Sequence, residues 1–257
     1  MHLMKTLLPT LLATLLIGTA SAQTPPAAAA SAAKAGETTA NVAIGPRLIL
    51  VGDSTMAPRS GYGNALCARF QQVACINLAR GGRSSMSFRA EGLWSTVLAL
   101  LNEGGAARQK TLVLIQFGHN DQPGKPGRST DLATEFGPNM AGYVAGVKAA
   151  GGEVLLITPL TRRTFKDGQL PNDLRPWAEA ILKVGAEQGV PVLDLNALSH
   201  AAVAALGQAG ADTLAEAPPR FDRTHLGPQG AALFSQQVME EMLRLRPELA
   251  RARTLSP

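Results

Sequence analysis

The sequence predicts an α/β fold in which helices cover both faces of a central, five-stranded parallel sheet. Two observations predict this fold. Five short apolar runs alternate with longer Ala/Leu-rich stretches that have helical spacing, which is the order of βαβ units. Several of the short runs are apolar at successive positions, as expected for strands that are covered on both sides.

The first strand follows from the unbroken apolar run 48–51, which ends at a Gly-Asp-Ser turn. Comparable runs give the other strands, and the five are 48–51, 73–78, 111–117, 153–158 and 190–195. The stretches between and after them have the spacing of amphipathic helices. We expect helices at 63–70, 91–103, 131–149, 174–188, 196–208 and 228–245.

The first 45 residues are expected to lie outside this fold. Residues 1–22 have the features of a signal peptide, because a positive Lys5 precedes an apolar stretch and an Ala-Ser-Ala cleavage motif that ends at Ala22. The apolar stretch is too short to span a bilayer comfortably, which argues against a membrane anchor. Residues 23–45 are rich in Ala, Pro, Thr and Ser, which predicts a flexible leader. We therefore expect a secreted or periplasmic protein, cleaved near Ala22.

The rest of the chain has the length of one domain, which we place at 46–250, followed by a C-terminal tail at 251–257. The formal net charge is +5, which fits an anionic substrate but also fits a soluble surface alone. The arginines are scattered and lack an aromatic-studded basic stripe, so nucleic-acid binding is not supported. We expect a monomer without stable membrane insertion.

The chain contains two cysteines, Cys67 and Cys75. Export would permit a disulfide that clips the predicted helix 63–70 to the next strand. Two buried free thiols are the alternative, and we expect the disulfide.

Polar, glycine-containing stretches follow three of the predicted strands. They lie at 52–54, 79–85 and 118–121. In open parallel sheets, sites form beyond the carboxyl ends of the strands, where the strand order reverses. The three stretches are therefore expected to meet at one edge of the sheet.

Ser54 is a turn residue or a nucleophile, and a nucleophile needs a base and an orienting group. Asp222 and His225 lie three residues apart in an irregular stretch before the last helix, where a short turn can place the carboxylate on one imidazole nitrogen. Of the other histidines, His2 leaves with the signal peptide, and His200 lies in an Ala-rich helix. Such a pair is more often incidental than catalytic, so this spacing alone leaves Ser54 open as a turn residue or as a nucleophile with His225 as base and Asp222 as orienter.

An acyl-transfer site also needs donors for the developing oxyanion. The backbone N–H of Ser54 follows a strand and precedes a helix, and that of Gly82 lies where the chain can approach a ligand closely. The side-chain amide of Asn120 is the third candidate. Each also has a structural explanation, namely a turn, a flexible loop and an Asx turn.

Together these stretches resemble the four blocks of the SGNH (GDSL-type) hydrolases. Residues 52–54 match the nucleophile block, Gly82 the glycine block, 118–121 the GxND block and 222–225 the DxxH block, in the family's order. The resemblance implies a flavodoxin-like three-layer α/β/α sandwich. It also implies the Ser54–His225–Asp222 triad, and an oxyanion hole formed by Ser54, Gly82 and Asn120, with no cofactor and no metal.

A narrower resemblance, carried by 52–57, 81–85, 91–94, 116–121 and 222–226, is to the rhamnogalacturonan acetylesterase branch. Members of that branch remove acetyl groups from pectic polysaccharide, which implies an acetylated poly- or oligosaccharide as substrate. Only 4% of the residues are aromatic, so a long stacked cleft is not evident, and a short oligosaccharide or another acetylated glycan would fit.

Substrate contacts are expected in the same loops. Arg83 and Arg89 flank the glycine block, and Trp94 and His119 lie near it; His119 could instead be structural. Bidentate pairing with a uronate carboxylate is one explanation for the arginines in these loops, and solvated loop charge is the other. The arginines concerned are Arg59, Arg83, Arg89, Arg128, Arg162 and Arg163.

Three other functions are alternatives to the acetylesterase. A metal-dependent phosphoesterase would need several His and Asp ligands, and only His119, His200 and His225 remain after processing. A non-catalytic glycan-binding module conflicts with the intact Ser, Asp and His. A broad GDSL-type lipase, arylesterase or thioesterase is the nearest alternative to the acetylesterase.

Overall fold

The computed structural model describes residues 46–71, 73–103 and 111–252. The expected signal peptide 1–22 and leader 23–45 lie outside the described residues. The expected C-terminal tail begins inside a final 3₁₀ turn, η3 (Pro247–Ala252), and residues 253–257 lie outside the description.

The five predicted strands form one parallel sheet in the order β2-β1-β3-β4-β5, which confirms the predicted fold class. Because β1 lies between β2 and β3, the strand order reverses between β1 and β3, where a site is expected. The strands are β1 (Arg47–Gly52), β2 (Ala74–Asn77), β3 (Thr111–Gln116), β4 (Glu153–Ile157) and β5 (Val192–Leu193).

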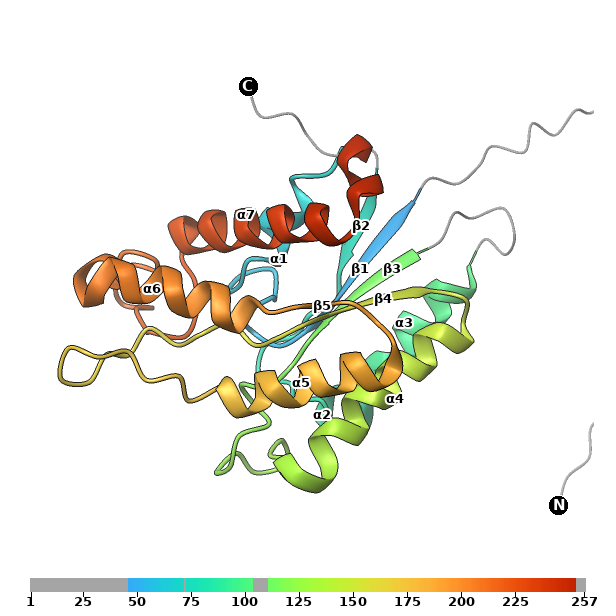
Figure 1. The fold of residues 1–257 in the computed structure, drawn as a ribbon, viewed down its shortest axis with the longest axis horizontal. Coiled ribbons are helices and arrows are strands. Elements are labelled where there is room, and N and C mark those ends of the chain that lie inside the picture. The colour runs from blue at the N-terminus through green and yellow to red at the C-terminus, as the bar shows by residue number, and fades with distance from the viewer. Residues whose placement is uncertain (1–45, 72, 104–110, 253–257) are drawn as a thin grey trace, which may run out of the picture. The chain divides into compact units, whose positions relative to one another are not determined.

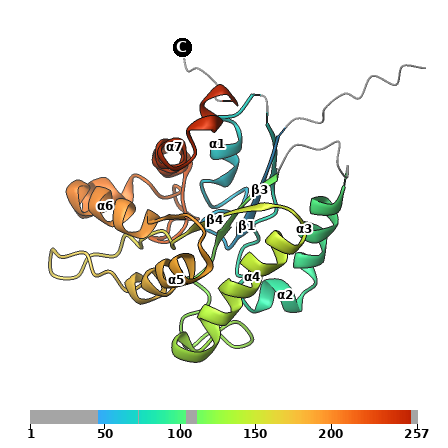
Figure 2. The ribbon, with the colours of Figure 1, turned by 45° about the vertical axis from the view of Figure 1, so that its right-hand side comes forward.

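Helices cover both faces of the sheet (Figures 1 and 2). One face carries α1 (Gly63–Cys67), α6 (Leu195–Asp212) and α7 (Pro228–Leu245). The other carries α2 (Ser87–Ala90), α3 (Leu93–Asn102), the π-helical turn η2 (Leu132–Phe136), α4 (Gly137–Ala149) and α5 (Arg175–Gln188).

The alternation of side chains along β1 explains the two cores. Leu48 and Leu50 pack on the α1/α7 face, and Ile49 and Val51 pack on the α3/α4 face. All four are at most 2% exposed, which explains the unbroken apolar run 48–51 of β1. Burial of each such side chain contributes about 1.5–3 kcal/mol of hydrophobic stabilisation.

β5 is shorter than the predicted strand 190–195. Its start is limited by Pro191, which has no N–H and pairs with β4 only by accepting from Leu156 N at 3.1 Å. Its end is set by Asp194, whose side chain accepts a hydrogen bond from Ala197 N and caps α6. The predicted helix 196–208 extends instead to Asp212, with a break at Gly207 where φ is 63°.

Cys67 at the end of α1 and Cys75 in β2 are joined by a disulfide, with their Cα atoms 5.4 Å apart. The disulfide links α1 to the edge strand of the sheet. Across the described residues, no helix is both long and apolar enough to cross a membrane.

Candidate active site

The turn after β1 presents Ser54 at the switch point of the sheet. Asp53 builds this turn, because its Oδ1 atom accepts hydrogen bonds from Thr55 N (2.9 Å) and Thr55 Oγ1 (2.8 Å). The Asp53 carbonyl also accepts from Ala57 N at 3.0 Å, which closes one helical turn. Ser54 therefore lies in this turn and not directly before α1, as the sequence had suggested. Within the described part of the chain the Ser54 hydroxyl has no hydrogen-bond partner, so it is not consumed by the turn.

The loop before α7 pairs Asp222 with His225. The Nδ1 atom of the imidazole lies 2.8 Å from Asp222 Oδ2, while Asp222 Oδ1 accepts from the backbone N–H groups of Thr224 and His225, both at 2.7 Å. Partial burial raises the pKa of Asp222, but the hydrogen bonds from His225 and Thr224 and the charge of His225 together hold it below its ordinary value. The carboxylate therefore stays ionised and fixes both the imidazole ring and the loop that carries it.

Arg163 holds the same loop in place through hydrogen bonds to its carbonyl groups. This fully buried arginine, in the loop after β4, donates to the carbonyls of Asp222 (3.0 Å), Thr224 (3.3 Å) and His225 (2.6 Å). Burial lowers its pKa to about 10, while Asp222 and Asp212 oppose the shift. Three carbonyl acceptors occupy the guanidinium, so Arg163 is not free to bind a uronate.

Ser60 connects the serine turn to the His225 loop. Its hydroxyl donates to the carbonyl of Ser54 at 2.8 Å, and its own carbonyl accepts from Leu226 N at 2.9 Å. The nucleophile turn and the residue after His225 are thus joined through one side chain and one peptide group. No direct hydrogen bond joins Ser54 to His225 in this structure; such bonds are often looser in the free enzyme.

The glycine loop and the loop after β3 close the site from the other side. A Cβ placed on Gly81 would lie 3.7 Å from Ser54 Cβ, so this loop passes directly beside the serine. Gly82 has φ of 78°, a conformation that favours glycine. Asn120 Nδ2 donates to the carbonyl of Arg83 at 3.0 Å, which places the amide beside the glycine loop. The structure therefore brings the three candidate oxyanion donors to one edge of the sheet.

The chain matches the GDSL-like Lipase/Acylhydrolase family over residues 49–233, a stretch that contains all the loops described above. It belongs to this GDSL-like family.

The chain is similar to two proteins that are named as rhamnogalacturonan acetylesterases and to one solved structure. The chain is 31% identical over 156 residues to the probable rhamnogalacturonan acetylesterase YesY of Bacillus subtilis, covering 58% of this chain and 69% of that protein. It is 28% identical over 213 residues to the rhamnogalacturonan acetylesterase RhgT of the same organism, covering 76% and 88%. The crystal structure of Bacillus subtilis YxiM superimposes with a TM-score of 0.66 at 25% identity, over 79% of this chain and 57% of that one.

In this GDSL-like acylhydrolase a buried network lies beneath Ser54. Tyr62 OH donates to Gln116 Oε1 (2.7 Å), and Gln116 Nε2 donates to Thr55 Oγ1 (2.7 Å), which in turn donates to Asp53. His119 Nδ1 lies 3.4 Å from Asp53 Oδ2. Burial raises the pKa of Asp53, but His119 and Thr55 outweigh it and lower the pKa below its ordinary value. The network ties the end of β1 to the end of β3.

His119 belongs to this network and not to the surface of the site. It is 2% exposed, so the suggested substrate contact is replaced by the structural role that the sequence also allowed. Its neighbour Asp121 accepts from Ser85 N (3.0 Å), Ser85 Oγ (2.5 Å) and Thr130 Oγ1 (3.2 Å). Burial raises the pKa of Asp121 to about 6, although these hydrogen bonds oppose the shift.

The side chains of Arg89 in α2 and Trp94 in α3 pack against Tyr143 of α4. The Arg89 guanidinium lies 4.1 Å from the ring centroid of Tyr143, and Trp94 meets the same ring edge-on with centroids 4.7 Å apart. Trp94 also packs over Gly146 of α4, so neither residue is placed as the sequence suggested. Arg83 lies in the glycine loop, but its guanidinium forms an ion pair with Glu91 at 2.7 Å.

One residue that contacts the Ser54 turn was not singled out by sequence reasoning. Ser60 was missed because a serine six residues after the nucleophile carries no motif. Arg80 lies three residues after the end of β2, directly before Gly81, and its side chain is exposed. Among the described residues, no cluster of three or more His, Cys, Asp or Glu side chains is arranged to hold a metal ion.

Proposed function

We propose that this GDSL-like esterase is a serine carbohydrate esterase that removes O-acetyl groups from pectic, rhamnogalacturonan-type or related glycans. The names of YesY and RhgT support the acetyl-glycan assignment, and the family supports ester hydrolysis. The observation that carries the proposal is the Asp222–His225 hydrogen bond in a loop docked on Ser60, which itself holds Ser54.

In the proposed mechanism, the Nε2 atom of His225 takes the proton of the Ser54 hydroxyl as Oγ attacks the acetyl carbonyl. Asp222 holds Nδ1–H and stabilises the imidazolium that forms. The tetrahedral oxyanion is bound by the backbone N–H groups of Ser54 and Gly82 and by the Asn120 amide. The C–O bond to the sugar breaks, and His225 returns the proton to the sugar oxygen.

The second half of the reaction removes the acetyl group. A water molecule gives a proton to His225 and attacks the acetyl carbonyl on Ser54. The new oxyanion collapses, the bond to Ser54 Oγ breaks, and His225 reprotonates the serine. Acetate leaves, and no step draws on a cofactor. We also propose that the enzyme meets its substrate outside the cytoplasm, because residues 1–22 have the features of a signal peptide.

Acetate release tests this function. We expect the purified protein to release acetate from acetylated rhamnogalacturonan, and to turn over 4-nitrophenyl acetate faster than long-chain 4-nitrophenyl esters. Ser54→Ala should lower both acetyl activities by several orders of magnitude, since triad residues act as a unit. Faster turnover of long acyl chains would favour the lipase or thioesterase alternative, and full activity of Ser54→Ala would contradict the mechanism.

A further inference from the structure

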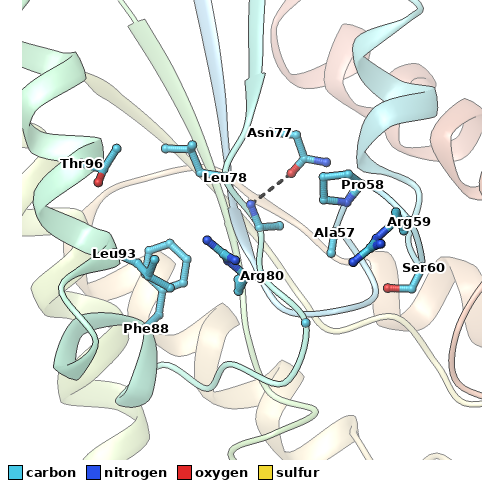
Figure 3. Close-up of a pocket in the computed structure, with 12 residues that line it drawn as sticks. Ala57, Pro58, Arg59, Ser60, Asn77, Leu78, Arg80, Phe88, Leu93 and Thr96 are labelled. Carbon is cyan, nitrogen blue, oxygen red and sulfur yellow. Dashed lines mark hydrogen bonds between the residues drawn. The ribbon is translucent and has the colours of Figure 1, made fainter.

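A hollow of about 450 Å³ lies next to Ser54 at the β2 edge of the sheet (Figure 3). One wall is the loop after β1, the floor is the end of β2, and the other wall is α2 with the start of α3. The lining residues are Ala57, Pro58, Arg59, Ser60, Asn77, Leu78, Ala79, Arg80, Gly81, Phe88, Leu93 and Thr96.

The hollow adjoins the serine on two sides. Ser60, from one wall, donates to the Ser54 carbonyl at 2.8 Å. Gly81, at the end of the floor, approaches so closely that a Cβ on it would lie 3.7 Å from Ser54 Cβ. A sugar whose acetyl group reaches Ser54 would therefore have a neighbouring sugar residue over this hollow.

The walls of the hollow are held in place by backbone contacts. Asn77 Nδ2 donates to the Met56 carbonyl (3.0 Å), while Asn77 Oδ1 accepts from Ala79 N (3.1 Å). Arg80 N donates to the Gly52 carbonyl at 2.9 Å, which fixes the base of the Arg80 side chain. The hollow is thus built on the strand ends and needs no rearrangement to exist.

Two guanidinium groups give the hollow a positive charge. Figure 3 shows Arg59 beside Ser60 on one wall, and Arg80 between that wall and Phe88 and Leu93. Both are exposed, and no Asp or Glu is among the lining residues. Neither guanidinium has a hydrogen-bond or ion-pair partner in the described residues.

The other arginines of the site loops are already engaged. Arg83 pairs with Glu91, and Arg162 pairs with Asp173. Arg89 stacks on Tyr143, Arg128 donates to the Gly82 carbonyl at 3.4 Å, and Arg163 holds the His225 loop. Arg59 and Arg80 are thus the arginines near Ser54 that the described contacts leave open to a ligand.

We infer that the hollow is a subsite for a carboxylate-bearing sugar, and that Arg59 and Arg80 bind its carboxylate. A carboxylate suits these two guanidinium groups because each can donate two hydrogen bonds to it. The partly exposed side chains of Leu78 and Leu93 would cover the face of the sugar ring. This inference rests on the proposed glycan deacetylation. It makes Arg59 and Arg80 responsible for a preference of the enzyme for acidic over neutral acetylated glycans.

The test compares two matched substrates: an O-acetylated oligogalacturonate and an O-acetylated galacto-oligosaccharide of equal length, which differ in the carboxylate. We expect Arg59→Gln and Arg80→Gln each to lower kcat/KM on the acidic substrate about 3- to 10-fold, and the double variant about 10- to 50-fold. Activity on the neutral substrate and on 4-nitrophenyl acetate should stay within about two-fold of wild type.

Lys183→Gln is the matched control, because it removes one positive charge from α5, at the opposite edge of the sheet. It should leave the ratio of acidic to neutral turnover unchanged. Raising the salt concentration to about 0.5 M should lower acidic turnover in the wild type and have less effect in the double variant. Equal losses on all three substrates, or an unchanged ratio in the double variant, would overturn the inference.

Binding separates this inference from the proposed function. Calorimetry with the Ser54→Ala protein and the acidic oligosaccharide should show affinity that falls about 10-fold or more when both arginines are replaced. If the wild type cleaves 4-nitrophenyl acetate and the neutral glycan while binding is unaffected by the arginines, the subsite is wrong and the esterase stands. If no ester is cleaved but binding still depends on both arginines, the esterase is wrong and the subsite stands.

Discussion

The backbone N–H of Leu226 donates a 2.9 Å hydrogen bond to the carbonyl of Ser60, a residue 166 positions earlier in the chain. Ser60 also donates from its hydroxyl to the Ser54 carbonyl, so the loop that carries His225 is held against the turn that carries the serine. The proposed catalytic residues come from opposite ends of the domain sequence, and this contact joins them.

Asp222→Asn should lower kcat about 10²- to 10⁴-fold with little change in KM. The amide can still accept the Thr224 and His225 backbone N–H groups, but it cannot hold Nδ1–H of the imidazole as a carboxylate does. Steady-state kinetics on 4-nitrophenyl acetate measure the effect. The unfolding midpoint serves as the control for loop structure. Wild-type kcat in this variant would remove Asp222 from the mechanism.

Asn120→Ala should lower kcat about 10²- to 10³-fold if its amide binds the oxyanion. The same amide donates to the Arg83 carbonyl, so some of the loss would come from a displaced glycine loop. Asn120→Asp removes the same donor and places a negative charge beside the oxyanion, so it should lower kcat at least as far. Activity near wild type in both variants would show that Asn120 contributes no donor.

Arg163→Gln should lower both stability and kcat. The variant loses donors to three buried carbonyls, which costs about 2–4 kcal/mol in free energy of unfolding. Arg163→Lys should recover only part of this loss, because a lysine ammonium donates from one nitrogen whereas this guanidinium donates from two. Denaturant unfolding and kcat are the measurements, with Arg162→Gln as the neighbouring control on an exposed ion pair. Unaltered unfolding of Arg163→Gln would contradict the assigned role.

Asp121→Asn should change how stability varies with pH. The pKa of Asp121 is raised to about 6 in the fold, so the folded state holds a proton that the unfolded state releases near its ordinary pKa. Its contribution to stability is therefore full in acid and is lost as the pH rises from about 4 through about 6.

The asparagine of that variant keeps the Oδ1 acceptor for Ser85 and Thr130 but does not titrate. Wild-type stability should fall by roughly 3 kcal/mol relative to the variant between about pH 4 and pH 7. Denaturant unfolding at several pH values measures the difference. A difference that stays constant over this range would contradict the raised pKa.

The sequence predicted the sheet because the centres of β1 and β3 are buried on both faces and therefore carry unbroken apolar runs, 48–51 and 112–115. It predicted Ser54, Asp222 and His225 as candidates because their neighbours are short-range motif residues. It named Arg163 only as a loop arginine and could not predict that Arg163 holds the His225 loop. The acceptors of its guanidinium lie 59 to 62 positions away and depend on how the loop after β4 meets the loop before α7.

The sequence also could not predict how exposed each side chain near the site is. Arg89 and Arg59 were both expected in site loops, yet Arg89 lies in α2 and stacks on Tyr143, while Arg59 faces the hollow. Likewise, a histidine in a strand-end loop can face the substrate or the core. His119 is buried against Asp53, at the strand ends that the Gln116–Thr55 hydrogen bond joins.

Covalent labelling tests the central claim most directly. Diethyl 4-nitrophenyl phosphate transfers a diethylphosphoryl group to an activated serine, and peptide mass spectrometry locates the group. We expect a single modified site at Ser54 in the wild type, with labelling slowed by orders of magnitude in His225→Ala. Labelling on another residue, or equally fast labelling of Ser54 without His225, would contradict the account.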